Sequence, residues 1–298
     1  MREFIIGTDW WTDCDDAVAM RIAARAHKNE EIKILGVGIN ACMEYSVSSL
    51  KYFFEAEGVF DLPYGIDHDA TDYGGTPSYQ KNLSKLSDSN FSNFDAMSAV
   101  GLYRKLLSGA AGKVEIVEIG FPQILSGLLL SHPDGFSPLN GYDLVKEKVS
   151  KIWMMAGKWD VQGGLEHNFK QTPRSRNAAE IFCRLCPVPT TFLGFEIGVS
   201  VISGGELAHD DLLHKVLCDH GSKNGRSSWD PMLMLMAVIG DEEKAGYNMT
   251  VGKARVDAAT GENFFDEGDG MHAFVTKKHC DEYYKNAINE RISSTRGI

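Results

Sequence analysis

Residues 4–17 read FIIGTDWWTDCDDA, an apolar run followed by four carboxylates within eight positions. The run FIIG at residues 4–7 indicates a buried strand, and residues 15–29 carry apolar side chains at helical spacing. A strand that leads directly into a helix is the opening unit of an alternating fold. The carboxylates Asp9, Asp13, Asp15 and Asp16 therefore lie where the chain leaves its first strand.

The same unit recurs along the chain, because short β-branched runs alternate with longer amphipathic stretches. Further strands are expected at residues 32–39, 63–67, 113–120, 151–155 and 190–193. Helices are expected at residues 15–29, 45–58, 93–109, 122–131, 178–186 and 232–240. This alternation predicts an α/β fold with a doubly wound, mostly parallel sheet flanked by helices.

Two stretches depart from the alternation. Residues 66–91 are polar and rich in Gly, Ser and Asp, which predicts a long loop, and loops of this length are often lids or binding segments. Residues 249–278 place two strand-like runs around a turn-rich centre, which predicts a small antiparallel hairpin near the C-terminus. Neither stretch resembles a linker, so we expect a single domain over residues 1–298.

Composition narrows the classes of function. The 298 residues are 43% hydrophobic and carry a formal net charge of −11, with acidic residues dispersed along the chain. Such a surface repels phosphate backbones and anionic lipids, which argues against nucleic-acid polymers and membranes as partners. The first apolar run is too short for a signal peptide and the six cysteines are scattered, so we expect reduced thiols and a cytoplasmic location.

The acidic cluster requires a chemical explanation. Ligands of open parallel sheets bind outside the carboxyl ends of the strands, where this cluster is expected. Carboxylates held close together repel one another unless a cation compensates, and Ca²⁺ accepts six to eight oxygen ligands. The competing interpretation is that Asp13, Asp15 and Asp16 cap the following helix, but one cap accounts for one carboxylate. The sequence therefore predicts a calcium site.

Other polar residues follow predicted strands. A Gly-rich loop after residues 151–155 carries Glu166, His167 and Asn168, which suits a ligand rich in hydroxyl groups, although an exposed loop has the same composition. Ile119 lies at a strand end, where its carbonyl can face the same edge of the sheet. Ser228 or Asp230 can cap the predicted helix near residue 232, with Pro231 at its first position.

Taken in order, these motifs resemble the calcium-dependent nucleoside hydrolases of the inosine-uridine-preferring type. Their signature of an Asp, a short turn and Asp-Asp-Ala opening a helix is similar to residues 9–17. The remaining counterparts are Asn40, Ile119-Gly120, Met155-Ala156-Gly157, Glu166-His167-Asn168, Ala178-Ala179 and Ser228-Trp229-Asp230. The resemblance covers the whole chain and implies a homodimer or homotetramer with Ca²⁺ in a deep pocket.

The resemblance also implies roles for individual residues. The implied Ca²⁺ ligands are Asp9, Asp16, Asp230 and the carbonyl of Ile119. The implied contacts to ribose and base come from Asn40, Asp15, Glu166, Asn168 and Trp229. Asp9 is the implied general base, which removes a proton from a Ca²⁺-bound water as that water attacks the N-glycosidic bond of a ribonucleoside.

Departures from the family pattern leave three questions open. Two extra residues precede Asp15, so Asp13 is a ligand, a supporting group or a cap. Trp229 stands where several members carry a His that protonates the leaving base; conceivable substitutes are His167, His209, His214, His272 and Tyr247. The alternatives are a hydrolase of another ribosyl compound, or a non-catalytic calcium-dependent sugar or nucleoside-binding protein in which Trp10, Trp11 and Trp229 stack on the ligand.

Overall fold

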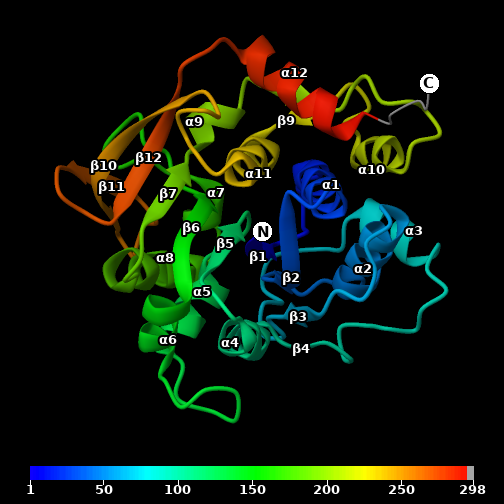
Figure 1. The fold of residues 1–298 in the computed structure, drawn as a ribbon. Coiled ribbons are helices and arrows are strands. Elements are labelled where there is room, and N and C mark those ends of the chain that lie inside the picture. The colour runs from blue at the N-terminus through cyan, green and yellow to red at the C-terminus, as the bar shows by residue number, and fades with distance from the viewer. Residues whose placement is uncertain (294–298) are drawn as a thin grey trace.

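The computed structural model describes residues 1–293, and its elements alternate as the sequence predicts (Figure 1). The strands are β1 (Arg2–Thr8), β2 (Ile32–Ile39), β3 (Tyr64–Ile66), β4 (Met97–Ser98), β5 (Val114–Glu118), β6 (Val149–Met155), β7 (Thr190–Leu193), β8 (Ile202–Ser203), β9 (Arg226–Ser227), β10 (Tyr247–Val256), β11 (Asn263–Glu267) and β12 (His272–Lys277). The helices are α1 (Asp15–Lys28), α2 (Ser46–Ala56), α3 (Ser78–Ser84), α4 (Ala99–Gly109), α5 (Gln123–Leu130), α6 (Gly141–Lys148), α7 (His167–Lys170), α8 (Pro173–Leu185), α9 (Phe195–Gly198), α10 (Leu212–His220), α11 (Trp229–Ile239) and α12 (Asp281–Ile292).

In the described part of the chain, the main sheet has ten strands in the order β11-β10-β12-β7-β6-β5-β1-β2-β3-β4. Strands β1 to β7 pair in parallel with their neighbours. The chain winds outward from β1 through β2, β3 and β4, and then returns to add β5, β6 and β7 on the other side of β1. The predicted doubly wound sheet is therefore confirmed, and its winding reverses between β1 and β5.

Helices cover both faces of this sheet (Figure 1). Alternate residues of β1 point to opposite faces, so Phe4 and Ile6 pack in one apolar core while Ile5 packs in the other. The first core contains buried side chains of α1, α2, α10, α11 and α12. The second contains those of α4, α5, α6 and α8. Burial on both faces explains why the central strands are apolar throughout rather than alternating.

The predicted C-terminal hairpin is confirmed, because β10 and β12 pair antiparallel. It extends the main sheet, since β12 also pairs in parallel with β7. The turn-rich segment between these strands contains a third strand, β11, which pairs antiparallel with β10. Phe265 of β11 is buried against Trp159, at a centroid distance of 5.7 Å, and this contact fixes a segment that reads as a turn in the sequence.

Two predicted boundaries differ from the structure. The helix expected over residues 93–109 begins at Ala99, because Ser98 caps it by accepting a hydrogen bond from the Gly101 N–H. The loop expected over residues 66–91 contains α3, whose Tyr79 and Leu83 are buried against the core. The first difference reflects a local helix cap, and the second reflects tertiary contacts of α3 that a polar composition hides.

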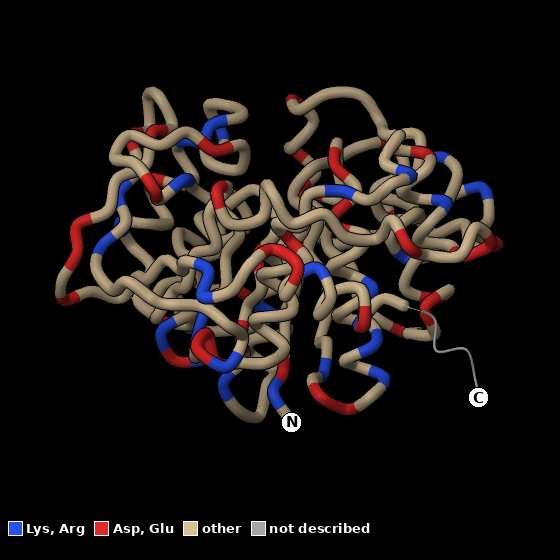
Figure 2. Tube along the Cα trace, turned by 90° about the horizontal axis from the view of Figure 1, so that it is seen from above, with Lys and Arg blue, Asp and Glu red and all other residues tan. Residues whose placement is uncertain are grey.

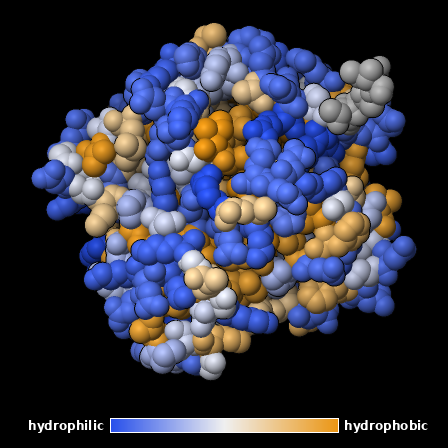
Figure 3. Space-filling view, in the orientation of Figure 1, coloured by the Kyte–Doolittle hydropathy of each residue, from blue (hydrophilic) through white to orange (hydrophobic). Residues whose placement is uncertain are grey.

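The surface agrees with the charge pattern of the sequence. Figure 2 shows Asp and Glu spread over the whole trace and interspersed with Lys and Arg. Figure 3 shows a largely hydrophilic face broken by scattered hydrophobic patches. The six cysteines are free thiols, and among residues 1–293 no helix is both long and apolar enough to span a bilayer.

Candidate active site

Most of the predicted site residues meet at the point where the winding of the sheet reverses, and Asn40 is the exception. Asp9 directly follows β1, and Ile119 directly follows β5. In open α/β sheets, the crevice outside the strand ends at such a point is the usual place for a ligand. A cavity of ≈ 220 Å³ lies here, lined by Asp9, Trp11, Thr12, Asp13, Asp15, Asp16, Ile119, Met155, Glu166, His167, Asn168, Phe195, Arg226, Trp229 and Asp230.

Three carboxylates of the cavity form a tight cluster. Oxygen atoms of Asp15, Asp16 and Asp230 lie within 4.8 Å of one another, and each residue is at most 5% exposed. The first turns of α1 and α11 bring them together, because the Asp230 N–H donates to Asp15 Oδ2 at 3.1 Å. Helix N-termini favour negative charge, so this geometry partly offsets the repulsion between the carboxylates.

Asp9 and Asp16 are fixed by the loop that separates β1 from α1. Asp16 accepts hydrogen bonds from the Thr8 hydroxyl and from the Trp10 N–H, the latter at 3.2 Å. Asp9 accepts a hydrogen bond from the Trp11 N–H at 2.9 Å. Asp9 lines the same cavity but lies outside the tight cluster, whereas Asp15, an implied ribose contact, lies within it.

The electrostatics of the cluster favour a bound cation. Burial, and then the charges of Asp13 and Asp16, raise the pKa of Asp15 well above its usual value. Burial also dominates at Asp230, Asp16 and Asp9, where neighbouring carboxylates again help to raise the pKa of each group. A divalent cation with oxygen ligands would compensate these charges. The donor set, three clustered carboxylates with Asp9 and Ile119 beside them, fits a divalent cation that prefers oxygen ligands.

Asp13 has a different environment from its neighbours. Its carboxylate forms a two-pronged ion pair with Arg226, at 2.7 Å from Nε and 2.6 Å from Nη2. It also accepts from the Cys14 N–H at 2.7 Å, while the N-cap residue Cys14 makes no side-chain cap. The structure therefore brings Asp13 to the cavity wall as the partner of Arg226. Arg226 carries no sequence signal, because its partner lies 213 residues away in the chain.

Glu166 and Asn168 line the side of the cavity formed by β6 and α7. The Glu166 carboxylate accepts from the main-chain N–H groups of Gly157 at 2.9 Å and Asn168 at 2.8 Å. The Asn168 side-chain amide donates to the Met155 carbonyl at 2.8 Å. Burial raises the pKa of Glu166 to about 7. Both side chains are thus held rigidly, with oxygens available for ligand hydroxyl groups.

Asn40 does not line the cavity, although the family resemblance implies a ribose contact. It is fully buried, donates to Glu118 Oε1 at 2.7 Å, and accepts from the Phe121 N–H at 2.9 Å. At Gly120, an added Cβ would lie 2.3 Å from the Asp9 nitrogen, so this junction is closed to any larger residue. Asn40 therefore holds the segment on either side of Ile119, which does line the cavity.

Glu118 is a buried carboxyl group that the sequence analysis missed. Its environment, above all burial, raises its pKa to about 8, and its Oε2 atom is buried without a hydrogen-bond partner among the described residues. The sequence does contain a signal for Glu118, because this carboxylate ends a largely apolar strand, directly before the implied ligand Ile119.

Aromatic side chains form the rest of the cavity wall. Trp11 stacks on His167 at a centroid distance of 6.1 Å, and Trp229 stacks on Phe195 at 5.5 Å. Trp10 does not take part, because it is fully buried and its indole N–H donates to the Ser49 hydroxyl at 2.8 Å. The expectation that Trp10 stacks on a ligand is therefore wrong.

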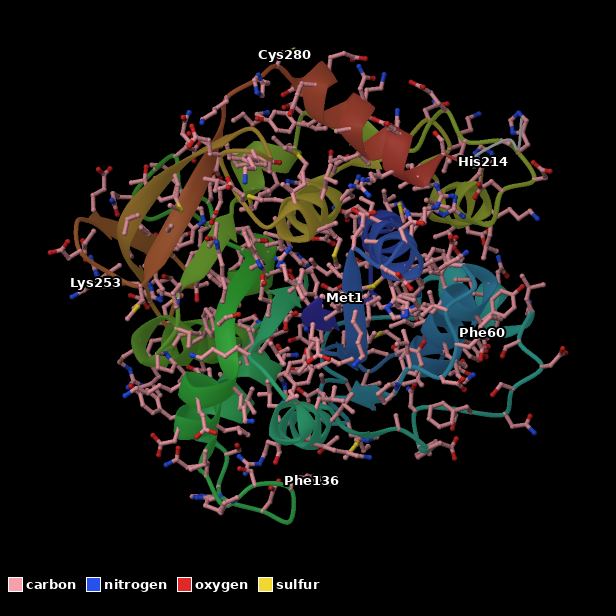
Figure 4. All side chains as sticks on the ribbon, viewed as in Figure 1. Met1, Phe60, Phe136, His214, Lys253 and Cys280 are labelled. Carbon is pink, nitrogen blue, oxygen red and sulfur yellow. The ribbon has the colours of Figure 1, made fainter. Side chains whose placement is uncertain are left out.

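Of the conceivable proton donors, His167 lies at the cavity. His214 lies on α10 (Figure 4), where it is buried and its Nε2 atom is 3.1 Å from the Nδ1 atom of His209. His272 accepts from the Ala254 N–H on β10 and packs against Phe192. Tyr247 is buried against Tyr284. These four side chains are absent from the cavity wall described above.

Comparison with solved structures supports the expected fold. The chain is similar to an inosine-uridine preferring nucleoside hydrolase from Bacillus anthracis, with 11% identity, a TM-score of 0.71, and coverage of 98% of this chain and 99% of that chain. A purine-preferring ribonucleoside hydrolase from Gardnerella vaginalis gives 16% identity, a TM-score of 0.73 and coverage of 98% of each chain. The type III effector protein XopQ, complexed with adenosine diphosphate ribose, gives 14% identity, a TM-score of 0.67 and coverage of 98% and 93%.

Comparison by sequence identifies no relative, since no protein-family model and no curated protein matches the chain. The agreement in fold nevertheless extends over almost the whole chain in each structural comparison. The chain therefore has the fold of the nucleoside hydrolases.

Proposed function

We propose that this protein hydrolyses the N-glycosidic bond of ribonucleosides, releasing ribose and a free base, with Ca²⁺ bound by its acidic cluster. One observation carries the proposal. The carboxylates of Asp15, Asp16 and Asp230 converge in a buried cavity that Glu166 and Asn168 also line. The fold shared with two ribonucleoside hydrolases supports it.

Each part of the cavity has a role in this reaction. When bound, Ca²⁺ would lower the pKa of a water molecule and bind ribose hydroxyl oxygens. Asp9 accepts a proton from the attacking water as general base. Glu166 and Asn168 hydrogen-bond the ribose and orient it. The bond breaks through an oxocarbenium-like transition state, whose positive charge a carboxylate-lined cavity stabilises more than the neutral substrate.

Ribose release from inosine, uridine and adenosine tests the proposal directly. We expect reducing sugar from at least one nucleoside in the presence of Ca²⁺, and its loss after chelation. Asp9→Asn should lower kcat by about 10²–10⁴, the usual contribution of a general base. Asp269→Asn, at an exposed turn, is the matched control. An unchanged kcat in Asp9→Asn would remove Asp9 from its role, and saturable binding without ribose release would refute hydrolysis.

A second candidate substrate is a ribosyl compound other than a nucleoside. The XopQ structure with the same fold holds adenosine diphosphate ribose. Trp229 also alters the part of the cavity expected to receive the base. The same assay with ribosyl compounds that carry other leaving groups separates the two substrate classes. A purely binding protein is less well supported, since Trp10 is unavailable for stacking.

Three broader expectations stay predictions. They are the single domain over residues 1–298, assembly into a homodimer or homotetramer, and the cytoplasmic location. Sedimentation of the purified chain would determine the assembly state.

A further inference from the structure

The aromatic part of the cavity must receive the base, because the carboxylates occupy the part that holds the ion and sugar. Departure of a nucleobase leaves an electron pair on a ring nitrogen, and protonation of the base stabilises this leaving group. Trp229 occupies the place from which a family His performs this step, and an indole cannot supply a proton. A side chain that protonates the base would therefore have to come from elsewhere in the cavity wall.

The cavity wall contains several side chains that donate hydrogen bonds. The indole N–H of Trp11 donates to the Gly75 carbonyl at 3.0 Å, and that of Trp229 donates to the Phe195 carbonyl at 2.8 Å. Arg226 is held by Asp13, and a guanidinium does not release its proton in proteins. These three donors are therefore excluded as acids.

The remaining polar groups of the wall are also poor candidates. Asn168 already donates its amide to the Met155 carbonyl, and an amide is not an acid. Glu166 accepts hydrogen bonds from the main-chain N–H groups of residues 157, 168 and 169, and the proposed function assigns it to the ribose rather than to the base. The Thr12 hydroxyl is too weakly acidic for proton transfer to a base.

His167 differs from all of these groups. Its Nε2 atom is buried and has no hydrogen-bond partner among residues 1–293, which leaves a polar group whose bonding capacity a ligand could satisfy. Its ring packs against Trp11, at a centroid distance of 6.1 Å, and against Phe121, at 5.5 Å, and this packing fixes its position in the wall. Imidazole is also the side chain best suited to proton transfer near neutral pH, and burial lowers the pKa of His167 below its usual value, which makes its protonated form a stronger acid.

We infer that His167 is the catalytic acid that protonates the leaving base. The inference rests on the proposed function. It assigns the protonation of the leaving base, a step for which the family pattern provides no residue in this chain. As the C1′–N bond breaks, its electron pair passes to the base, and the base takes a proton from the His167 imidazolium. The ribosyl C1′ takes hydroxide from water, whose other proton passes to Asp9. Proton exchange with solvent then restores both side chains.

A leaving group that needs no proton provides the test. Nitrophenolate leaves without protonation, so p-nitrophenyl β-D-riboside bypasses the acid while using the same ion and sugar site. His167→Phe keeps the aromatic packing against Trp11 and Phe121 and removes the proton. We expect His167→Phe to lower kcat/KM for the best nucleoside about 10²–10³-fold, within the usual range for a general acid. Its kcat/KM for the nitrophenyl riboside should change less than about threefold.

Two further variants complete the design. His167→Gln should lose as much activity on the nucleoside as His167→Phe, because an amide donates a hydrogen bond but no proton. His132→Phe, at an exposed position after α5, should match the unchanged protein on both substrates. The Ca²⁺-induced rise in Tm should persist in every variant, which confirms an intact fold and ion site.

The outcomes separate this inference from the function on which it rests. Equal losses of His167→Phe on both substrates, or no loss on the nucleoside, would overturn the role of His167 while leaving hydrolysis established. Inactivity of the unchanged protein on both substrates would refute the proposed function and the assignment of His167 with it.

Discussion

Asp230 enters the cavity from the first turn of α11, where it is only 5% exposed. Burial, followed by the charges of Asp15, Asp16 and Asp9, raises its pKa well above the usual value. A carboxyl group in this environment destabilises the ion-free fold at neutral pH, because ionisation there is opposed by both burial and repulsion. Sites that bind a cation commonly trade stability for function in this way.

The substitution Asp230→Asn should therefore have opposite effects on stability and on ion binding. We expect the Tm of the Ca²⁺-free protein to rise by about 2–4 °C at pH 7, equivalent to about 1 kcal/mol for a domain of this size. Addition of Ca²⁺ should no longer raise the Tm. Asp269→Asn, an exposed change of equal charge, should leave both values unchanged. Thermal unfolding with and without Ca²⁺ measures both effects, and a lower ion-free Tm in Asp230→Asn would contradict this account.

At the scale of elements, α3 and the segment before it hold the acidic loop between β1 and α1. Trp10 and Thr12 of this loop have φ values of 48° and 56°, in the left-handed region that costs non-glycine residues about 1–3 kcal/mol each. The buried Gln80 side chain donates to the Trp10 carbonyl, and the Tyr79 hydroxyl donates to the Asp13 carbonyl at 2.9 Å. These contacts stabilise a strained loop whose two ends carry the carboxylates of the site.

Gln80→Met removes this support while preserving the volume of the buried side chain. We expect the affinity for Ca²⁺, measured by calorimetric titration, to fall about tenfold, or about 1.4 kcal/mol, because the loop must then be ordered during binding. Excess Ca²⁺ should restore ribose release, which a general loss of folded structure would not allow. Lys81→Ala, an exposed change on the same helix, is the control. Unchanged Ca²⁺ affinity in Gln80→Met would show that α3 does not position the site.

The same elements show how far the sequence could predict the structure. The run FIIG followed by clustered Asp residues sufficed to place Asp9 at the edge of a parallel sheet, because strand ends and helix starts have local signals. The helix α3 and the strand β11 lack such signals, since a few buried aromatic residues fix them within polar segments. The burial of Asn40 and the Asp13–Arg226 pair depend on contacts between distant segments, which a single sequence does not reveal.

At the scale of the whole molecule, the fold buries several carboxyl groups in surroundings that favour their protonated form. Burial raises the pKa of Glu166 to about 7 and that of Glu118 to about 8, and the groups of the acidic cluster shift in the same direction. The folded protein without Ca²⁺ therefore binds more protons than the unfolded chain between about pH 4 and pH 8. Because stability falls with pH wherever the folded state binds more protons, the ion-free protein loses stability over this range.

Under the proposed function, Ca²⁺ should reverse this dependence, because its binding requires the ionised form of carboxylates that protons otherwise occupy. We expect the Tm of the Ca²⁺-free protein to fall from pH 5 to pH 8, and the rise in Tm caused by a fixed Ca²⁺ concentration to grow over the same range. Asp230→Asn should retain part of the fall, which Glu118 and Glu166 also cause, but should show no growing effect of Ca²⁺. A Ca²⁺ effect that is constant between pH 5 and pH 8 would mean that the ion displaces no protons, so these carboxylates could not be its ligands.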